Sequence, residues 1–159
     1  MDKAEFSERV MAIQGRLYRV SYGLLREPQD RMDAVQEAIL KAWHNLNRLR
    51  NEKFLETWLT RILINECHNV QRARQRLVPL EVVPEPIAPP EGANAQLHDA
   101  LMALPEHMRL PVMLYYMEGY KTREIAQILK LPEGTVKTRL KRARQELKNM
   151  LSEPEEVLK

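Results

Sequence analysis

The chain has 159 residues, a formal net charge of +3 and a single cysteine. This length allows one ordinary domain or two small ones. One cysteine excludes an internal disulfide framework, and without a spaced His/Cys cluster we expect neither a metal nor a cofactor. Nothing resembles a signal peptide or reaches the roughly 20 apolar residues of a membrane span, so we expect a cytoplasmic protein.

Charge is unevenly distributed along the chain. Residues 80–100 contain four acids and neither lysine nor arginine, so the two flanking halves are more basic than the total suggests. This asymmetry favours a nucleic-acid partner.

Helical spacing of apolar residues predicts three helices in the N-terminal half. The first covers about residues 3–26 and is ended by Pro28, and Asp30 is expected to cap the second, which reaches Leu46. A polar stretch, 47–53, precedes a third helix over about 54–76. The third helix is expected to turn these residues inward: Leu55, Trp58, Leu59, Ile62, Leu63 and Val70.

Two polar faces accompany these apolar ones. On the second helix, helical spacing places five residues on one side: Asp30, Asp33, Gln36, Glu37 and Lys41. A solvated face is the default interpretation of such a pattern. On the third helix, Arg61, Asn65, His68 and Arg72 form a polar stripe about four turns long, which suits a nucleic-acid strand.

Residues 77–94 contain five prolines. Proline removes backbone donors and disfavours helix at the residue before it, so we predict an extended linker. The linker divides the chain into two helical domains, 1–76 and 95–159. The second domain is predicted to begin with helices over about 95–104 and from Pro105 to Gly119; Pro111 either kinks the latter helix or marks its true start.

The last two predicted helices form a helix-turn-helix. They cover about 122–129 and, from Pro132, about 132–149. Ala126 lets the two helices approach closely, and the wedge between them is expected to consist of Ile125, Leu131, Val136 and Leu140. Lys130 occupies the turn position where glycine is usual, because glycine tolerates positive φ.

The final helix is strongly basic. Residues 134–148 hold six bases and one acid around a narrow apolar seam, which favours duplex DNA as the partner over a merely solvated helix. Opposite the seam, and so expected to face base edges, lie Gly134, Thr135, Thr138, Lys141, Arg142 and Gln145. On the flanks, where phosphates pass, lie Lys137, Arg139 and Arg144.

Two long stretches resemble bacterial sigma factors. "DRMDAVQEAILKAWHNL" (30–46) with "FLETWLTRILINECHNVQRARQR" (54–76) resembles their second conserved domain. "ALPEHMRLPVMLYYMEGYKTREIAQILKLPEGTVKTRLKRARQEL" (103–147) resembles their fourth. Because the proline-rich linker replaces a third domain, the plan resembles that of the extracytoplasmic function (ECF, group IV) sigma factors.

The resemblance implies an all-α, two-domain protein that is not itself an enzyme. Residues 1–76 would be sigma domain 2, which binds core RNA polymerase and the −10 element, 77–94 a flexible linker, and 95–159 sigma domain 4, which binds the −35 element. The implied partners are promoter DNA, the coiled coil of the largest polymerase subunit, and an anti-sigma factor.

The resemblance also assigns roles to residues. The polymerase would be bound by Asp30, Asp33, Gln36, Glu37, Lys41 and Trp43, although Trp43 is equally consistent with the core. The melted −10 strand would be bound by the third-helix stripe and by Asn47, Arg48, Arg50, Asn51 and Lys53, with the residue that captures the base left open. The alternatives are a stand-alone helix-turn-helix transcriptional regulator and a protein-interaction module without a DNA role.

Overall fold

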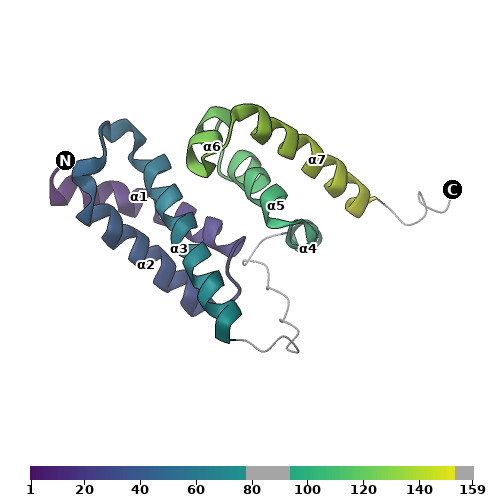
Figure 1. Ribbon diagram of the computed structural model, residues 1–159, viewed down its shortest axis with the longest axis horizontal. Coiled ribbons are helices and arrows are strands. Elements are labelled where there is room, and N and C mark those ends of the chain that lie inside the picture. The colour runs from purple at the N-terminus through teal and green to yellow at the C-terminus, as the bar shows by residue number, and fades with distance from the viewer. Residues whose placement is uncertain (78–93, 153–159) are drawn as a thin grey trace. The chain divides into compact units, whose positions relative to one another are not determined.

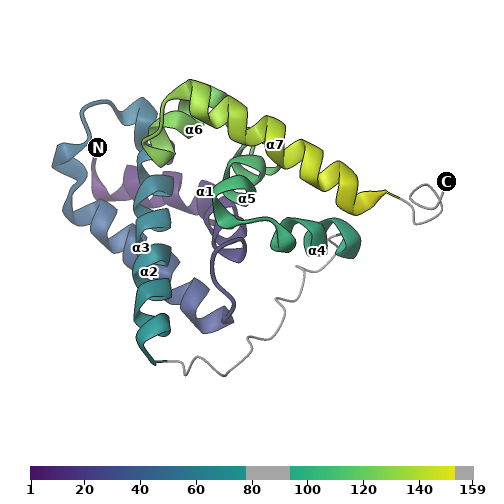
Figure 2. The ribbon, with the colours of Figure 1, turned by 45° about the vertical axis from the view of Figure 1, so that its right-hand side comes forward.

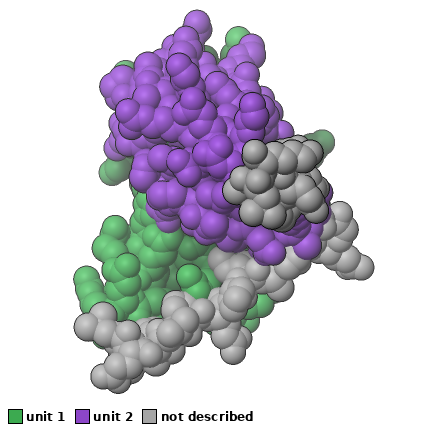
Figure 3. All heavy atoms as spheres, turned by 90° about the vertical axis from the view of Figure 1, so that its right-hand side faces the viewer, with its two compact units in different colours: residues 1–85, 127–129 green, residues 86–126, 130–159 purple. Residues whose placement is uncertain are grey.

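The computed structural model describes residues 1–77 and 94–152, and the regular structure within these ranges is entirely helical (Figure 1). The predicted all-α fold class is therefore confirmed. Two compact units make up the chain (Figure 3): the described part of the first is residues 1–77 with Gln127–Leu129, and the second holds the remaining residues from Asn94 onward. Apart from its end residues, the predicted linker lies outside the described residues.

Three long helices form the first unit. They are α1 (Lys3–Tyr22), α2 (Pro28–His44) and α3 (Leu55–Leu77), and two short 3₁₀ turns, Leu46–Arg48 and Glu52–Phe54, connect α2 to α3. α2 lies alongside α3, and α1 contacts both (Figures 1 and 2). Their shared core is apolar and fully buried at Leu17, Val20, Val35, Leu59 and Leu63.

The junction between the first two helices differs from the prediction. α1 ends at Tyr22 with Gly23 as its C-cap, before Pro28, and Pro28 is instead the first residue of α2. A proline suits this position because its missing N–H would have no partner inside the helix. Asp30 is not the cap either: Glu27 holds that position and makes no side-chain cap bond, while Asp30 lies in the first turn.

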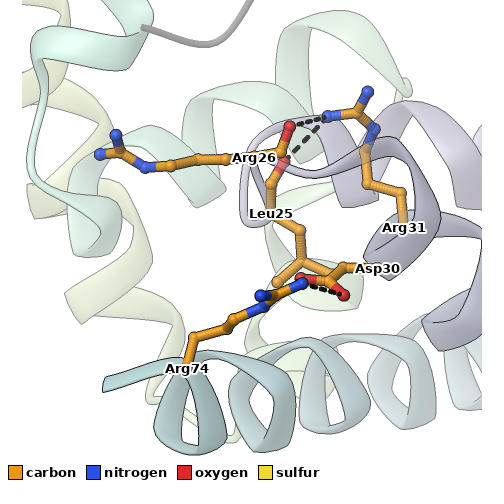
Figure 4. A network of polar contacts seen from close by, with 5 residues as sticks. All are labelled: Leu25, Arg26, Asp30, Arg31 and Arg74. Carbon is orange, nitrogen blue, oxygen red and sulfur yellow. Dashed lines mark hydrogen bonds and ion pairs between the residues drawn. The ribbon is translucent and has the colours of Figure 1, made fainter. Parts of the chain in front are cut away.

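A cluster of polar contacts holds this junction against α3 (Figure 4). The guanidinium of Arg31 donates to the carbonyl oxygens of Leu25 (3.1 Å) and Arg26 (3.0 Å) and lies 3.8 Å from the centroid of the Tyr22 ring. Arg74 of α3 makes a two-pronged ion pair with Asp30, at 2.8 and 3.0 Å. Paired Arg–carboxylate contacts of this kind fix orientation as well as distance, so they align α2 with the end of α3.

The buried side of α3 is rotated relative to the prediction. Leu55, Leu59 and Leu63 are buried as expected, but Trp58, Ile62 and Val70 are only half-buried. The residues buried beside the leucines include Thr60, Ile64, Glu66 and Cys67. Because α3 packs against both α1 and α2, small and polar side chains lie between helices on positions that hydrophobicity alone does not indicate.

The second unit contains four α-helices in its described part. These are α4 (Ala95–Ala103), α5 (Glu106–Val112), α6 (Thr122–Leu129, whose last residues are the Gln127–Leu129 segment grouped with the first unit) and α7 (Glu133–Leu151), with a π-helical turn, Met113–Met117, directly after α5. α4 and α5 both pack against α7 (Figures 1 and 2). Among the described residues, no helix is both long enough and apolar enough to cross a bilayer.

Two residues shape the beginning of this unit. Pro111 lies buried inside α5 and so does not start that helix; the wide π turn begins two residues later. Arg109 donates to the carbonyl oxygens of Leu101 (3.0 Å) and Leu104 (2.7 Å) at the end of α4. This arginine satisfies acceptors that a helix C-terminus leaves open, and it holds α4 against α5.

Candidate nucleic-acid interface

The helix-turn-helix is built around one residue with positive φ. Lys130 has φ 54° and ψ 50°, the left-handed conformation that the sequence position predicts. This conformation reverses the chain, and the N–H of Leu131 donates to the carbonyl of Ala126 at 3.0 Å. Pro132 is the N-cap of α7 and not its first residue, a difference of one position from the prediction.

A polar contact and an apolar wedge join the two helices of the motif. The hydroxyl of Thr122 donates to the Glu133 carboxylate at 2.8 Å, and this hydrogen bond, with Lys137 nearby, lowers the pKa of Glu133. The predicted wedge residues Ile125, Val136 and Leu140 are buried, and Leu131 is half-buried. α7 is thus held by its seam, with its basic faces outward.

An open groove of about 610 Å³ lies beside the first turns of α7. Its lining from α7 and the preceding turn is Pro132, Gly134, Thr135, Thr138, Arg139 and Arg142. Four of these are predicted base-facing residues. Lys141 and Gln145, also predicted to face base edges, are exposed but are not part of this lining.

Arg139, which was predicted to lie on the flank of α7, also reaches the groove. It is half-buried and lines the groove together with Arg142. The other flanking bases are exposed: Lys137 pairs with Glu133 at 3.7 Å, and Arg144 donates to the Tyr116 hydroxyl at 3.0 Å. The charged side chains of Lys137 and Arg144 are therefore held in position on the surface of α7.

Gly134 and Thr138 serve the groove in different ways. A Cβ atom at Gly134 would meet nothing within 4 Å, so the packing of this unit does not require glycine there, and the backbone stays open to a ligand. The hydroxyl of Thr138 donates to the Gly134 carbonyl at 3.0 Å, and the residue is exposed beside the groove. Thymine methyl groups in a major groove suit such a side chain.

His107 and Met108 of α5 also line the groove, and neither was predicted to do so from the sequence. They lie far from α7 in the chain, and only the packing of α5 on α7 brings them to the groove. Helical periodicity within either segment gives no signal for this contact.

The first unit carries the second predicted DNA surface. On α3, Asn65 and Arg72 are exposed and Arg61 and His68 are half-buried, so the predicted stripe lies away from the leucine core. Arg72 donates to the side chain of Asn69 one turn earlier. The connecting segment exposes all five predicted residues: Asn47, Arg48, Arg50, Asn51 and Lys53.

The predicted polymerase-binding face on α2 divides into two groups. Asp33, Gln36 and Glu37 are exposed, and Asp33 accepts a bond from Gln29 at 2.9 Å. Asp30 and Lys41 instead pair with residues of α3: Asp30 with Arg74, and Lys41 with Glu66. The hydrogen bond that Lys41 donates to the Glu66 carboxylate raises the pKa of Lys41.

Trp43 packs against α1 and is also partly exposed, so both interpretations that the sequence left open remain compatible with its position. Its ring lies 5.3 Å from that of Phe6 in α1, at an interplanar angle of 48°, and the residue is 36% exposed. Met32 and Leu40 are exposed apolar residues of the same helix, at 42% and 52%. The outer face of α2 is therefore a mixture of acids, amide and apolar side chains, which suits a protein surface better than a nucleic acid.

Comparison with known proteins identifies the family. The family description "Sigma-70 region 2" matches residues 10–77, and "Sigma-70, region 4" matches residues 94–147. The RNA polymerase sigma-H factor of Pseudomonas aeruginosa is 31% identical over 94% of this chain and 88% of its own. The ECF RNA polymerase sigma factor SigM of Mycobacterium tuberculosis is 34% identical over 94% of this chain and 79% of its own.

A solved structure agrees with these relatives. The sigma factor RpoE of Bartonella quintana, determined in complex with the anti-sigma factor NepR, is 26% identical with a TM-score of 0.79, over 92% of this chain and 96% of that one. The chain therefore belongs to the ECF sigma factors of RNA polymerase. A stand-alone helix-turn-helix regulator is not favoured, because a sigma-70 region 2 precedes the helix-turn-helix.

Proposed function

We propose that this chain binds core RNA polymerase and directs it to promoters by reading a −35 duplex and holding a melted −10 strand. In this proposal residues 1–76 form sigma domain 2, 77–94 link the domains, and 95–159 form sigma domain 4. The sigma factor acts in the cytoplasm, where polymerase and promoter DNA are found. It catalyses no reaction itself and leaves RNA synthesis to the polymerase.

The observation that carries the proposal is the groove along the start of α7. Its lining combines a residue without a side chain, two threonines and two arginines, which together suit base edges and phosphates in a major groove. Arg142 is the residue we expect to contact a base, because it is exposed on the side opposite the buried seam of α7. The lysine and arginine side chains farther along α7 then contact the phosphates of the DNA backbone.

The −10 surface consists of the α3 stripe and the segment 47–53, which we call the −10 loop. These adjoining segments of the chain carry arginine and lysine side chains for phosphates, asparagine amides for base edges, and a half-buried aromatic residue, Trp58. This combination suits single-stranded DNA. Extruding a base costs a few kcal/mol, and the contacts of the loop offset that cost.

Two protein partners are part of the proposal. The exposed face of α2, with Asp33, Gln36, Glu37 and Trp43, contacts the coiled coil of the largest polymerase subunit. An anti-sigma factor is the second partner, supported by the similar RpoE chain, whose structure was solved with the anti-sigma factor NepR.

Promoter-selective transcription tests the proposal. Purified protein is added to core polymerase with a pool of genomic promoter fragments, and run-off transcripts are sequenced. We expect transcripts whose start sites share paired −35 and −10 motifs. Transcripts no different from those of core polymerase alone, together with tight binding of the free protein to an isolated palindromic site, would instead favour a regulator.

A further inference from the structure

The −10 loop is built from single 3₁₀ turns. The first turn is closed by a bond from the N–H of Leu49 to the carbonyl of Leu46 (3.1 Å), and the second by one from Phe54 to Asn51 (3.0 Å). The side chain of Asn51 also accepts from the N–H of Lys53 at 3.0 Å. Short 3₁₀ turns have poorer hydrogen-bond geometry than α-helix, so such a loop keeps one conformation only with support from outside.

α1 supplies this support through two arginines. Arg9 donates from Nη2 to the carbonyl oxygen of Glu52 at 2.6 Å, and Arg16 forms an ion pair with Glu56 in the first turn of α3. Arg9 and Arg16 are seven residues apart, so they lie on the same face of α1, two turns from each other. One face of α1 therefore holds both the last turn of the loop and the start of the helix that follows.

The bond from Arg9 is suited to fixing position. A charged donor on a carbonyl oxygen is among the stronger hydrogen bonds in proteins, and its target is backbone, so it holds the turn whatever side chain the turn carries. Asn51 and Lys53, on either side of Glu52, are exposed, so the bond fixes the backbone between two residues that a ligand can reach. The Glu52 carboxylate itself pairs with the N-terminal ammonium of Met1 at 2.9 Å.

We propose that Arg9 is a positioning residue for −10 recognition: it holds the −10 loop in the conformation that receives the single strand, without contacting DNA itself. This inference rests on the proposed role of the loop. If the loop visits the competent conformation only part of the time, the apparent affinity falls by the populated fraction. Arg9 removes this loss by keeping the loop in place before the strand arrives.

The test uses the holoenzyme, formed from core polymerase and the full chain. The probes are the non-template −10 strand, as a fluorescent single-stranded oligonucleotide, and the −35 duplex, both from a promoter that the transcription assay identifies. The variants are Arg9→Met, which removes the donor, Arg9→Lys, which keeps a charged donor, and Lys3→Met, which removes an exposed charge from the same helix as a control.

We expect Arg9→Met to weaken binding of the −10 strand on the order of tenfold and to speed amide exchange in residues 47–53. Core affinity, −35 affinity and the salt dependence of −10 binding should stay as in wild type, and Arg9→Lys should recover much of the loss. Lys3→Met should behave as wild type.

Three results would overturn the inference. Unchanged −10 affinity and exchange in Arg9→Met would show that the loop needs no support from Arg9. A salt slope reduced by about one would identify Arg9 as a phosphate contact. Parallel losses of core and −35 affinity would indicate a general folding role. If the wild-type holoenzyme fails to bind the −10 strand at all, the proposed function itself fails, which is a separate result.

Discussion

Arg142 and Arg139 line the same groove, but their surroundings predict different roles. Arg142 is exposed opposite the seam of α7, whereas Arg139 is half-buried. We expect Arg142→Ala to weaken recognition of one −35 position by about 1–3 kcal/mol. Arg139→Ala should weaken all sequences equally, since phosphate contacts carry no sequence information. Binding of the holoenzyme to a panel of −35 variants measures both; identical loss profiles would contradict the assignment.

The backbone conformation of Lys130 is unfavourable for lysine and lowers the stability of the helix-turn-helix. Its φ of 54° lies in the left-handed region, where glycine is not penalised by a Cβ atom. We therefore expect Lys130→Gly to stabilise the helix-turn-helix by about 1 kcal/mol, measured by amide exchange in α6 and α7. Lys130→Ala is the control, because it removes the same charged side chain but keeps the Cβ atom at φ 54°. Equal effects of the two substitutions would contradict this account.

Glu133 makes the helix-turn-helix sensitive to acid. The Thr122 hydroxyl is the main reason that the pKa of Glu133 is lowered in the folded chain. A lowered carboxyl pKa means that the contribution to stability is present above the unfolded pKa, about 4.3, and is lost as pH falls through the folded value. Thr122→Val should raise the pKa of Glu133 toward its ordinary value, as seen by carboxyl NMR titration. An unchanged titration would show that the hydroxyl has no such effect.

Some features of single residues could be predicted from the sequence and others could not. The position of the turn at Lys130 was predictable, because helix-turn-helix spacing places it there, and the turn keeps its positive φ although lysine replaces the usual glycine. The roles of Arg31 and Arg109 were not: both donate to carbonyl oxygens of loops or helix ends, and any backbone carbonyl is an acceptor. Which carbonyl such a side chain reaches depends on packing, and no residue type at the receiving position indicates it.

Among the helices, α2 carries polar residues of two kinds: some pair with α3 and hold the unit together, and others face outward. Asp30 and Lys41 are paired across to α3, while Glu37 is exposed. We expect Glu37→Lys to lower affinity for core polymerase without unfolding the unit, because its charge meets the partner directly. Glu8→Lys, on the exposed side of α1, is the control of equal charge change. Affinity for core at the wild-type level in Glu37→Lys would exclude this face as the docking surface.

Helix boundaries were more predictable than helix faces. α4, α6 and α7 begin within a residue or two of the predicted positions, because asparagine, proline and the turn give local signals. The face of α3 was partly wrong, since Thr60, Glu66 and Cys67 are buried between helices. Periodicity detects an apolar stripe but not a polar residue that finds its partner inside, as Glu66 does with Lys41.

In the whole molecule, the proposed function divides between the two units: the second unit reads duplex DNA at −35, and the first opens the strands at −10. The division follows from the two surfaces: a helix beside a groove in the second unit, and a polar stripe with an adjoining loop in the first. Sequence spacing predicted both surfaces, because each lies along a single segment. The groove wall formed by α5 and the contact of α1 with the −10 loop were not predictable, since each joins segments far apart in the chain.

Permanganate reactivity of unpaired thymines at −10 tests this division most directly. The experiment compares wild type with Arg61→Ala combined with Arg72→Ala, and uses Arg19→Ala with Arg26→Ala as a charge-matched control of two exposed arginines in the same unit but outside α3. We expect the Arg61 and Arg72 double variant to bind core polymerase and −35 duplex nearly as wild type, to lose −10 reactivity, and to recover transcription on a promoter with a pre-opened −10 bubble. Normal reactivity in that variant would contradict the account and leave opening to the loop alone.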